Sequence, residues 1–207
     1  METIRKISII LFFACTVVSN SYSQDWKKLQ DAFNKSYTHE YKAEYSKAID
    51  DIKAIYDEKS YPVVLRLGWL NYLLGQYNES VNYYQKAINI MPYSIEAKLG
   101  YISPATALGK TDDVIRLYKE ILDIDSKNSL INYKIGSIYY EKKDYHNALK
   151  YLQESLNQYP LDYNITILYA WITYYLGKFN DAKILFNKAL LIKPSDSSAL
   201  DGLKLIK

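Results

Sequence analysis

A fixed spacing recurs along the sequence and limits what the chain can fold into. Pro92 and Pro160 are separated by twice the interval that separates Pro160 from Pro194. Self-similarity at a fixed period of this size is the signature of a repeat architecture, in which each unit buries its apolar face only against its neighbours. The same interval, or twice it, separates glycines that are followed two residues later by an aromatic residue or a threonine: Gly75 and Tyr77, Gly109 and Thr111, Gly177 and Phe179.

This register divides the chain into four units of equal length, at residues 61–94, 95–128, 129–162 and 163–196. In each unit, the residues before the glycine slot predict a first helix, because the turn that follows needs a permissive backbone. The next stretch predicts a second helix, since small and bulky residues recur there at steps of four and three and a proline can close the unit. These positions hold a small or apolar residue (Ser80, Val114, Ala148, Ala182), a bulky one (Tyr84, Tyr118, Leu152, Phe186) and another small or apolar one (Ala87, Ile121, Ser155, Ala189).

The repeated residues resemble the signature of the tetratricopeptide repeat (TPR) family, which combines a Leu-Gly pair, aromatic residues, an alanine and a closing proline in a period of about 34 residues. The second unit departs most, with Tyr101-Ile102 in place of the Leu-Gly pair, and all four units lack the family's early tryptophan. The resemblance implies an all-α fold, a right-handed α-solenoid of stacked helix-turn-helix repeats. In the first unit, the signature is met by Leu67-Gly68, Tyr77, Tyr84, Ala87 and Pro92.

Weaker patterns flank the four units. Residues 24–60 look like a degenerate first repeat, with helices over 26–33 and 45–56, and residues 197–207 fit a single capping helix. Terminal repeats of a solenoid are expected to be atypical, because one of their faces meets water.

A proline stands inside the predicted first helix of the second unit. Pro104 removes one backbone hydrogen bond and crowds the carbonyl group of Gly100. We therefore predict a kink or a break beside Ser103. It could have a function, as a widened pocket or a hinge, or it could be a local distortion that the fold tolerates.

The N-terminal segment, residues 1–23, has the three parts of a secretory signal peptide. Arg5 and Lys6 precede an apolar run over residues 7–18, and a small-residue site, Ser-Tyr-Ser, ends at Ser23. The run is shorter than the roughly 20 apolar residues of a membrane span. We therefore expect cleavage after Ser23, export to the periplasm or cell envelope, and no membrane span in the mature chain. Two minor alternatives are an uncleaved anchor and a lipid anchor through Cys15.

The sequence offers little from which to build a catalytic or metal site. Cleavage would remove the single cysteine, and His39 and His146 have neither another histidine nor a cysteine at metal-ligand spacing. No glycine-rich phosphate loop is present. The 26 basic and 23 acidic residues are interleaved, without the basic stripe typical of nucleic-acid binding. We therefore expect no catalysis, no cofactor, no metal and no nucleic-acid partner.

In the TPR family the first helix of each unit lines the concave face, and residues at i, i+4 and i+7 share one side of a helix. The resemblance therefore implies a groove in which rigid aromatic residues, a type enriched at binding hot spots, flank a small polar centre. The alternative is that some of these aromatic residues only pack between adjacent first helices. The candidate ligand-binding residues are Leu65, Trp69, Tyr72, Ser103, Thr106, Tyr133, Ser137, Tyr140, Trp171 and Tyr174.

The repeats, the export signal and the missing catalytic chemistry together favour a non-catalytic scaffold or adaptor. It would bind a protein or peptide, of an identity that the sequence does not indicate, in the periplasm or at the cell envelope. Two alternatives stay open. One is a structural subunit of an envelope assembly, with self-association through its aromatic surface. The other is a glycan-binding module in which Trp69 and Trp171 serve as stacking platforms.

Overall fold

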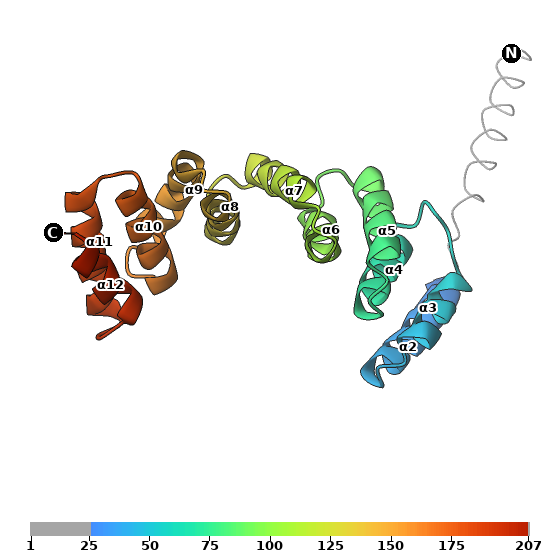
Figure 1. The fold of residues 1–207 in the computed structure, drawn as a ribbon. Helices are drawn as coiled ribbons and strands as arrows, with labels where there is room; N and C mark the ends of the chain where they lie inside the picture. The colour runs from blue at the N-terminus through green and yellow to red at the C-terminus, as the bar shows by residue number, and fades with distance from the viewer. Residues whose placement is uncertain (1–25, 207) are drawn as a thin grey trace, which may run out of the picture.

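The computed structural model describes residues 26–206, and these form eleven helices, with no strand, joined by short turns (Figure 1). The predicted all-α solenoid is confirmed over these residues, whereas the predicted signal peptide and Cys15 lie outside them. The first helix continues to Tyr41 instead of ending near Phe33. The helices are α2 (Trp26–Tyr41), α3 (Tyr45–Lys53), α4 (Tyr61–Leu73), α5 (Tyr77–Ile90), α6 (Ile95–Ala107), α7 (Thr111–Ile124), α8 (Ser129–Glu141), α9 (Tyr145–Gln158), α10 (Tyr163–Tyr175), α11 (Phe179–Ile192) and α12 (Ser197–Leu205).

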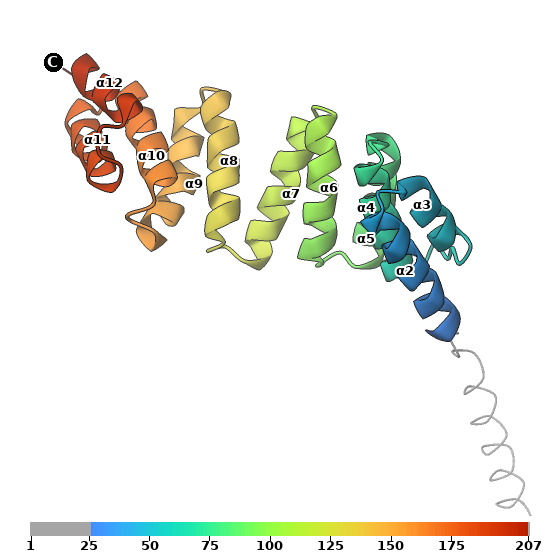
Figure 2. The same ribbon diagram turned by 90° about the horizontal axis from the view of Figure 1, so that it is seen from below.

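Successive helices pair and stack along an arc. Helices α4, α6, α8, α10 and α12 begin at positions 61, 95, 129, 163 and 197, so the helix pair recurs at the constant interval that the sequence predicts. In Figure 1, α6, α8 and α10 lie on the inner side of the arc, with α7, α9 and α11 outside them, and Figure 2 shows the same pairs from below. Helices α4 and α12 begin at the same position of the repeat, and these five are called the inner helices below. Contacts join α4 to α6, α8 to α10 and α10 to α12. The inner helices therefore form an extended surface that several repeats share.

Most inner helices begin at a side chain that caps them. The side-chain oxygens of Ser94, Asn128, Asp162 and Asp196 each accept a hydrogen bond of 3.0 to 3.1 Å from the backbone N–H three residues further on. Such a cap satisfies one of the N–H groups that the start of a helix leaves without a partner. The four capping residues recur at the same interval as the helix pairs, a regularity that the pattern of glycines and prolines did not reveal.

The turns inside the units adopt a left-handed backbone, as the glycine slots predict. Gly75, Gly109 and Gly177 have φ angles of 78°, 70° and 74°. Lys143 occupies the same slot in the third unit with a φ angle of 59°. Because a side chain is unfavourable in this conformation and glycine has none, the turn between α8 and α9 is the strained member of the series.

The core is built around one bulky side chain from each outer helix. Tyr84, Tyr118, Leu152 and Phe186 are at most 8% exposed. The small and apolar residues that precede and follow them at the steps of four and three are buried as well. The side chains that the repeat pattern assigns to the core therefore all lie there.

Two of these rings pack directly against glycines on the inner helices. A Cβ atom added to Gly68 on α4 would lie 3.0 Å from the ring of Tyr84, and one added to Gly100 on α6 would lie 2.1 Å from Tyr84 Cε1. Phe186 meets Gly202 on α12 in the same way, since a Cβ atom there would lie 2.3 Å from its Cζ atom. The missing side chains let each ring fill the space between successive inner helices.

Pro104 does not break its helix. Helix α6 runs through Pro104, whose side chain is buried, and the carbonyl oxygen of Pro104 accepts the backbone N–H of Leu108 at 3.0 Å. The predicted break is therefore wrong, since the helix continues on both sides of the proline. A kink beside Ser103 stays a prediction.

Replacing Gly100 with alanine tests the close approach of the Tyr84 ring. The new methyl group overlaps the ring, and this overlap outweighs the gain of up to about 1 kcal/mol that alanine brings to a helix interior. We expect Gly100→Ala to lower the free energy of unfolding by about 1–2 kcal/mol in urea denaturation. The exposed residue Ser103 on the same helix provides the control, since Ser103→Ala should change stability little. A Gly100→Ala variant as stable as the control would contradict the packing described above.

Candidate functional site

Two clefts open along the inner helices. The first has a volume of about 550 Å³ and is bounded by α2, α4 and α6, with Leu65 and Trp69 among its walls. The second has a volume of about 450 Å³ and is bounded by α8, α10 and α12. Six of the ten predicted groove residues line one of these clefts: Leu65 and Trp69 the first, and Tyr133, Ser137, Tyr140 and Trp171 the second.

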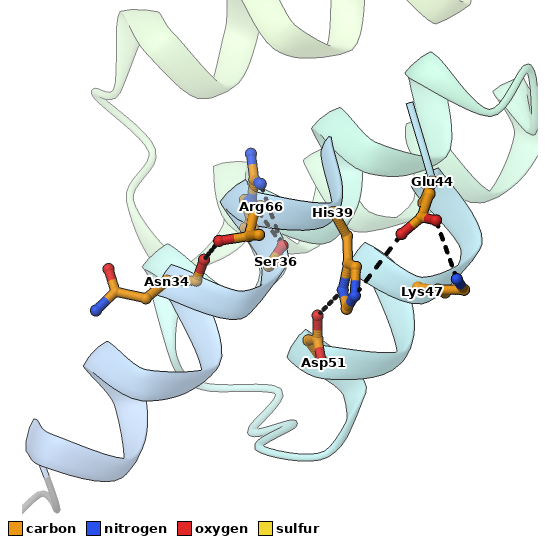
Figure 3. Close-up of polar contacts among 8 residues, drawn as sticks. Asn34, Ser36, His39, Glu44, Lys47, Asp51 and Arg66 are labelled. Carbon is orange, nitrogen blue, oxygen red and sulfur yellow. Dashed lines mark hydrogen bonds and ion pairs between the residues drawn. The ribbon is translucent and has the colours of Figure 1, made fainter. Parts of the chain in front are cut away.

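A buried arginine organises the wall of the first cleft. Arg66 is the single charged residue of α4 and is only 6% exposed. Its guanidinium group donates hydrogen bonds of 3.1 and 3.2 Å to Ser36 Oγ on α2 (Figure 3) and forms an ion pair with Glu40. The same group lies 3.8 Å from the centre of the Tyr37 ring. The charge of Arg66 is therefore balanced within the protein, and its contacts join α2 to α4.

Glu40 also fixes the tryptophan of this cleft. The indole N–H of Trp69 donates a hydrogen bond of 2.8 Å to Glu40 Oε1, while the other carboxylate oxygen pairs with Arg66. Trp69 remains 40% exposed, and its ring lies 5.8 Å from that of Tyr72. One edge of the indole is thus held in place while much of its surface stays open to a ligand.

His39 has a structural role close to this cleft. Its Nδ1 atom lies 2.6 Å from Asp51 Oδ2 on α3, and its Nε2 atom lies 3.8 Å from Glu44 Oε2 (Figure 3). These contacts tie the end of α2 to α3. Over residues 26–206, no three or more histidine, cysteine, aspartate or glutamate side chains are arranged to hold a metal ion.

The tryptophan of the second cleft is held more tightly than Trp69. The indole N–H of Trp171 donates a hydrogen bond of 2.8 Å to Ser198 Oγ on α12. The edge of its ring system meets Phe186 at a centroid distance of 5.0 Å, and Tyr175 stacks on it at 6.0 Å. Trp171 therefore belongs partly to the core, which favours the packing interpretation over a free stacking platform at this residue.

The cap of α12 stabilises the far end of the second cleft. The ammonium group of Lys193, the hydroxyl of Tyr163 and the backbone N–H of Ala199 lower the pKa of Asp196 to about 2. Burial, together with the Asp196 carboxylate, raises the pKa of Tyr163 to about 12. Both groups therefore keep their ordinary charge near neutral pH, and they fix α12 where it supplies Ser198 to the cleft.

The other four predicted residues line neither cleft. Tyr72 packs between the rings of Trp69 and Tyr77, and Tyr174 packs against Trp171, Tyr175 and Phe179. Ser103 and Thr106 are exposed on α6. A small polar centre of the groove, like a binding role for the ten residues, stays a proposal.

The charged residues of the clefts escaped the sequence analysis. Glu40 and Arg66 were missed because they pair across a long stretch of sequence, and Glu96 and Glu141 because single exposed glutamates are common on helices. One signal was available for Arg66, since a lone charge in the apolar helix YPVVLRLGWLNYL requires a buried partner.

Comparison with known proteins agrees with the architecture. A tetratricopeptide repeat model matches residues 61–93, and a second one matches residues 139–205. The chain is a tetratricopeptide repeat protein. No curated protein matches it in sequence.

Two solved TPR-type structures show the same fold at low sequence identity. A crystal structure of a MamA protein has a TM-score of 0.70 and 16% identity, over 81% of this chain and 92% of that one. A tetratricopeptide repeat protein from Parabacteroides merdae ATCC 43184 has a TM-score of 0.72 and 19% identity, over 87% of this chain and 72% of that one. Within residues 26–206 of this TPR protein, no helix is long and apolar enough to cross a membrane.

Removing Arg66 tests the buried contact between the first two helix pairs. We expect Arg66→Met to lower the free energy of unfolding by about 3 kcal/mol, because Glu40 then keeps a largely buried charge without its partner. Adding Glu40→Gln should recover about 1 kcal/mol or more of that loss. The measurement is a denaturation series in urea.

Arg116 on α7 supplies the matched control. Its side chain is half exposed and pairs with Asp113 and Glu120 at the surface. Arg116→Met should cost no more than about 1 kcal/mol. Equal losses at the two arginines would show that the Arg66 contacts are no stronger than surface ion pairs.

Proposed function

We propose that this TPR protein is a non-catalytic scaffold that binds an extended segment of a protein partner along its inner groove. The observation that carries the proposal is the presence of two clefts bounded by inner helices of the solenoid, both with aromatic walls. Repeat solenoids use extended concave surfaces of this kind for binding. Aromatic side chains with few rotatable bonds are also enriched among the residues that dominate binding energy.

The walls of both clefts are held in place before a partner arrives. Trp69 is fixed through Glu40 and Trp171 through Ser198. Side chains that are already ordered lose little conformational entropy on binding, so more of the contact energy contributes to affinity. This preorganisation supports a recognition surface.

The lining of the clefts supports a binding role over a catalytic one. Among the described residues, the walls of the two clefts hold aromatic, aliphatic and hydroxyl side chains with Pro62, Asn164, three carboxylates and Arg66, but no histidine, cysteine or lysine. A nucleophile beside a general base is the usual sign of acyl or group transfer, and neither cleft supplies such a pair.

The place of action belongs to the same proposal. The signal-like N-terminus supports export, and a scaffold in the periplasm or at the cell envelope would meet its partner there.

Blocking the groove tests the proposed binding face. Ser137 lines the second cleft, so Ser137→Arg should fill it, and Trp69→Ala should remove an open wall of the first cleft. In crosslinking inside the cell followed by capture and mass spectrometry, we expect each variant to recover about tenfold less of the partner than the unmodified protein, a loss typical of a hot-spot residue.

An outer-face substitution of the same kind controls for charge and bulk. Asn82 is exposed on α5, away from both clefts, and Asn82→Arg should leave recovery unchanged. Circular dichroism checks that all three variants are folded. If the same proteins are recovered with the groove variants and with the unmodified protein, the inner face is not the binding site.

Export is tested separately by the mature N-terminus. When the chain with residues 1–23 is produced in a bacterium with a periplasm, N-terminal sequencing and intact mass should show a protein that begins at Gln24. Recovery of the chain with residues 1–23 attached, in the cytosolic fraction, would remove the support for action at the envelope.

A further inference from the structure

We propose that the groove selects a basic segment, with a lysine or arginine side chain of the partner seated in each cleft beside Glu96 and Glu141. This inference rests on the proposed function and names the chemistry of the partner. We infer a basic ligand because each cleft contains one carboxylate whose charge no ion pair balances among the described residues.

In the first cleft, one carboxylate forms no ion pair within the part of the chain that the structure describes. Arg66 and Glu40 balance each other through their ion pair, so they leave no net charge on the wall. Within residues 26–206 no ion pair engages Glu96, which lies exposed in the first turn of α6 and accepts a hydrogen bond of 3.2 Å from the hydroxyl of Tyr61. The cleft therefore carries a net charge of about −1 beside aromatic walls, a combination that favours a cation.

The aromatic walls of the first cleft suit the stem and the head of a basic side chain. Tyr37 and Trp69 are 44% and 40% exposed. The face of the Tyr37 ring already holds the guanidinium group of Arg66 at 3.8 Å, which shows that an aromatic wall of this cleft accepts a cation. The methylene groups of a lysine or arginine can pack on such rings while the charged end reaches a carboxylate.

The second cleft repeats this chemistry with different residues. Glu141 is exposed at the end of α8, beside the aromatic residues Tyr133 and Tyr140. Its neighbour Lys142 pairs with Asp112 on α7, at 3.0 Å, and no ion pair engages Glu141 among residues 26–206. The last carbonyl groups of α8 add negative partial charge at the same end. Both clefts thus present aromatic rings and one unbalanced carboxylate.

Peptide display identifies the ligand chemistry without a known partner. Random dodecapeptides are selected on the purified protein, and a selected peptide is resynthesised for fluorescence polarisation. We expect lysine or arginine to be enriched at one or two positions of the selected peptides. Glu96→Gln and Glu141→Gln should each weaken the binding of that peptide about tenfold, since each removes a charge-assisted contact in a partly desolvated site.

Two controls separate recognition from a general charge effect. Glu79 is an exposed carboxylate in the first turn of the outer helix α5, as Glu96 is in the first turn of α6, and Glu79→Gln should leave affinity unchanged. Replacing the basic residue of the peptide with glutamine should cause the same loss as the cleft variant. The two changes together should cost little more than either alone, because they break one contact.

The possible outcomes distinguish the two proposals. Two outcomes would overturn the basic-segment inference and leave the groove as the binding site. In the first, the selected peptides show no enrichment of lysine or arginine. In the second, both Glu→Gln variants bind the peptide with full affinity while Ser137→Arg abolishes binding. Peptides that bind Ser137→Arg and Trp69→Ala as well as the unmodified protein would overturn both. Selection that yields no binder would also contradict both, because the groove would then not accept an extended peptide.

Discussion

The close approach of one ring to glycines on two successive inner helices sets the geometry of this solenoid. Tyr84 lies against Gly68 on α4 and Gly100 on α6, where no Cβ atom intervenes. The size of the ring therefore determines how far apart these inner helices stand. Because Tyr84 also lines the first cleft, the residue that spaces the repeats contributes directly to the surface between them.

The ends of the solenoid depend on polar contacts in addition to apolar packing. At the N-terminal end, Arg66 joins α2 to α4 through Ser36 and Glu40. At the C-terminal end, Asp196 caps α12. A terminal helix has fewer neighbours on which to bury its apolar face, so directed hydrogen bonds and ion pairs specify its position. The same two regions hold the groove tryptophans, since Glu40 binds Trp69 and Ser198 on α12 binds Trp171. Residues near the two ends of the solenoid therefore also hold the groove tryptophans in place.

The ion pairs inside the protein also determine which charges of the groove stay unbalanced. The two buried basic residues of the N-terminal half each pair with an acidic residue, Arg66 with Glu40 and Lys98 with Glu120. Among the residues that line the two clefts, one exposed carboxylate in each, Glu96 and Glu141, forms no ion pair with any residue of 26–206. A surface can thus favour cationic ligands although the whole chain has a formal net charge of +3, because recognition depends on local and unbalanced charge.

The sequence by itself determined the helical repeat. Gly75, Gly109 and Gly177 mark turns, and the bulky residues from Tyr84 to Phe186 lie in the core as their spacing predicts. These features could be predicted because a repeat is specified by contacts between residues close in sequence and by a period that recurs. Tertiary structure decided the rest: that α6 continues through Pro104, that Trp171 is partly buried against the core while Trp69 stays open, and that Arg66 meets Glu40. Each of these outcomes depends on the direction of a side chain toward a neighbouring repeat. A sequence pattern predicts the spacing of residues along a helix. It does not predict the distance between helices, or the partner of a polar group that is buried away from water.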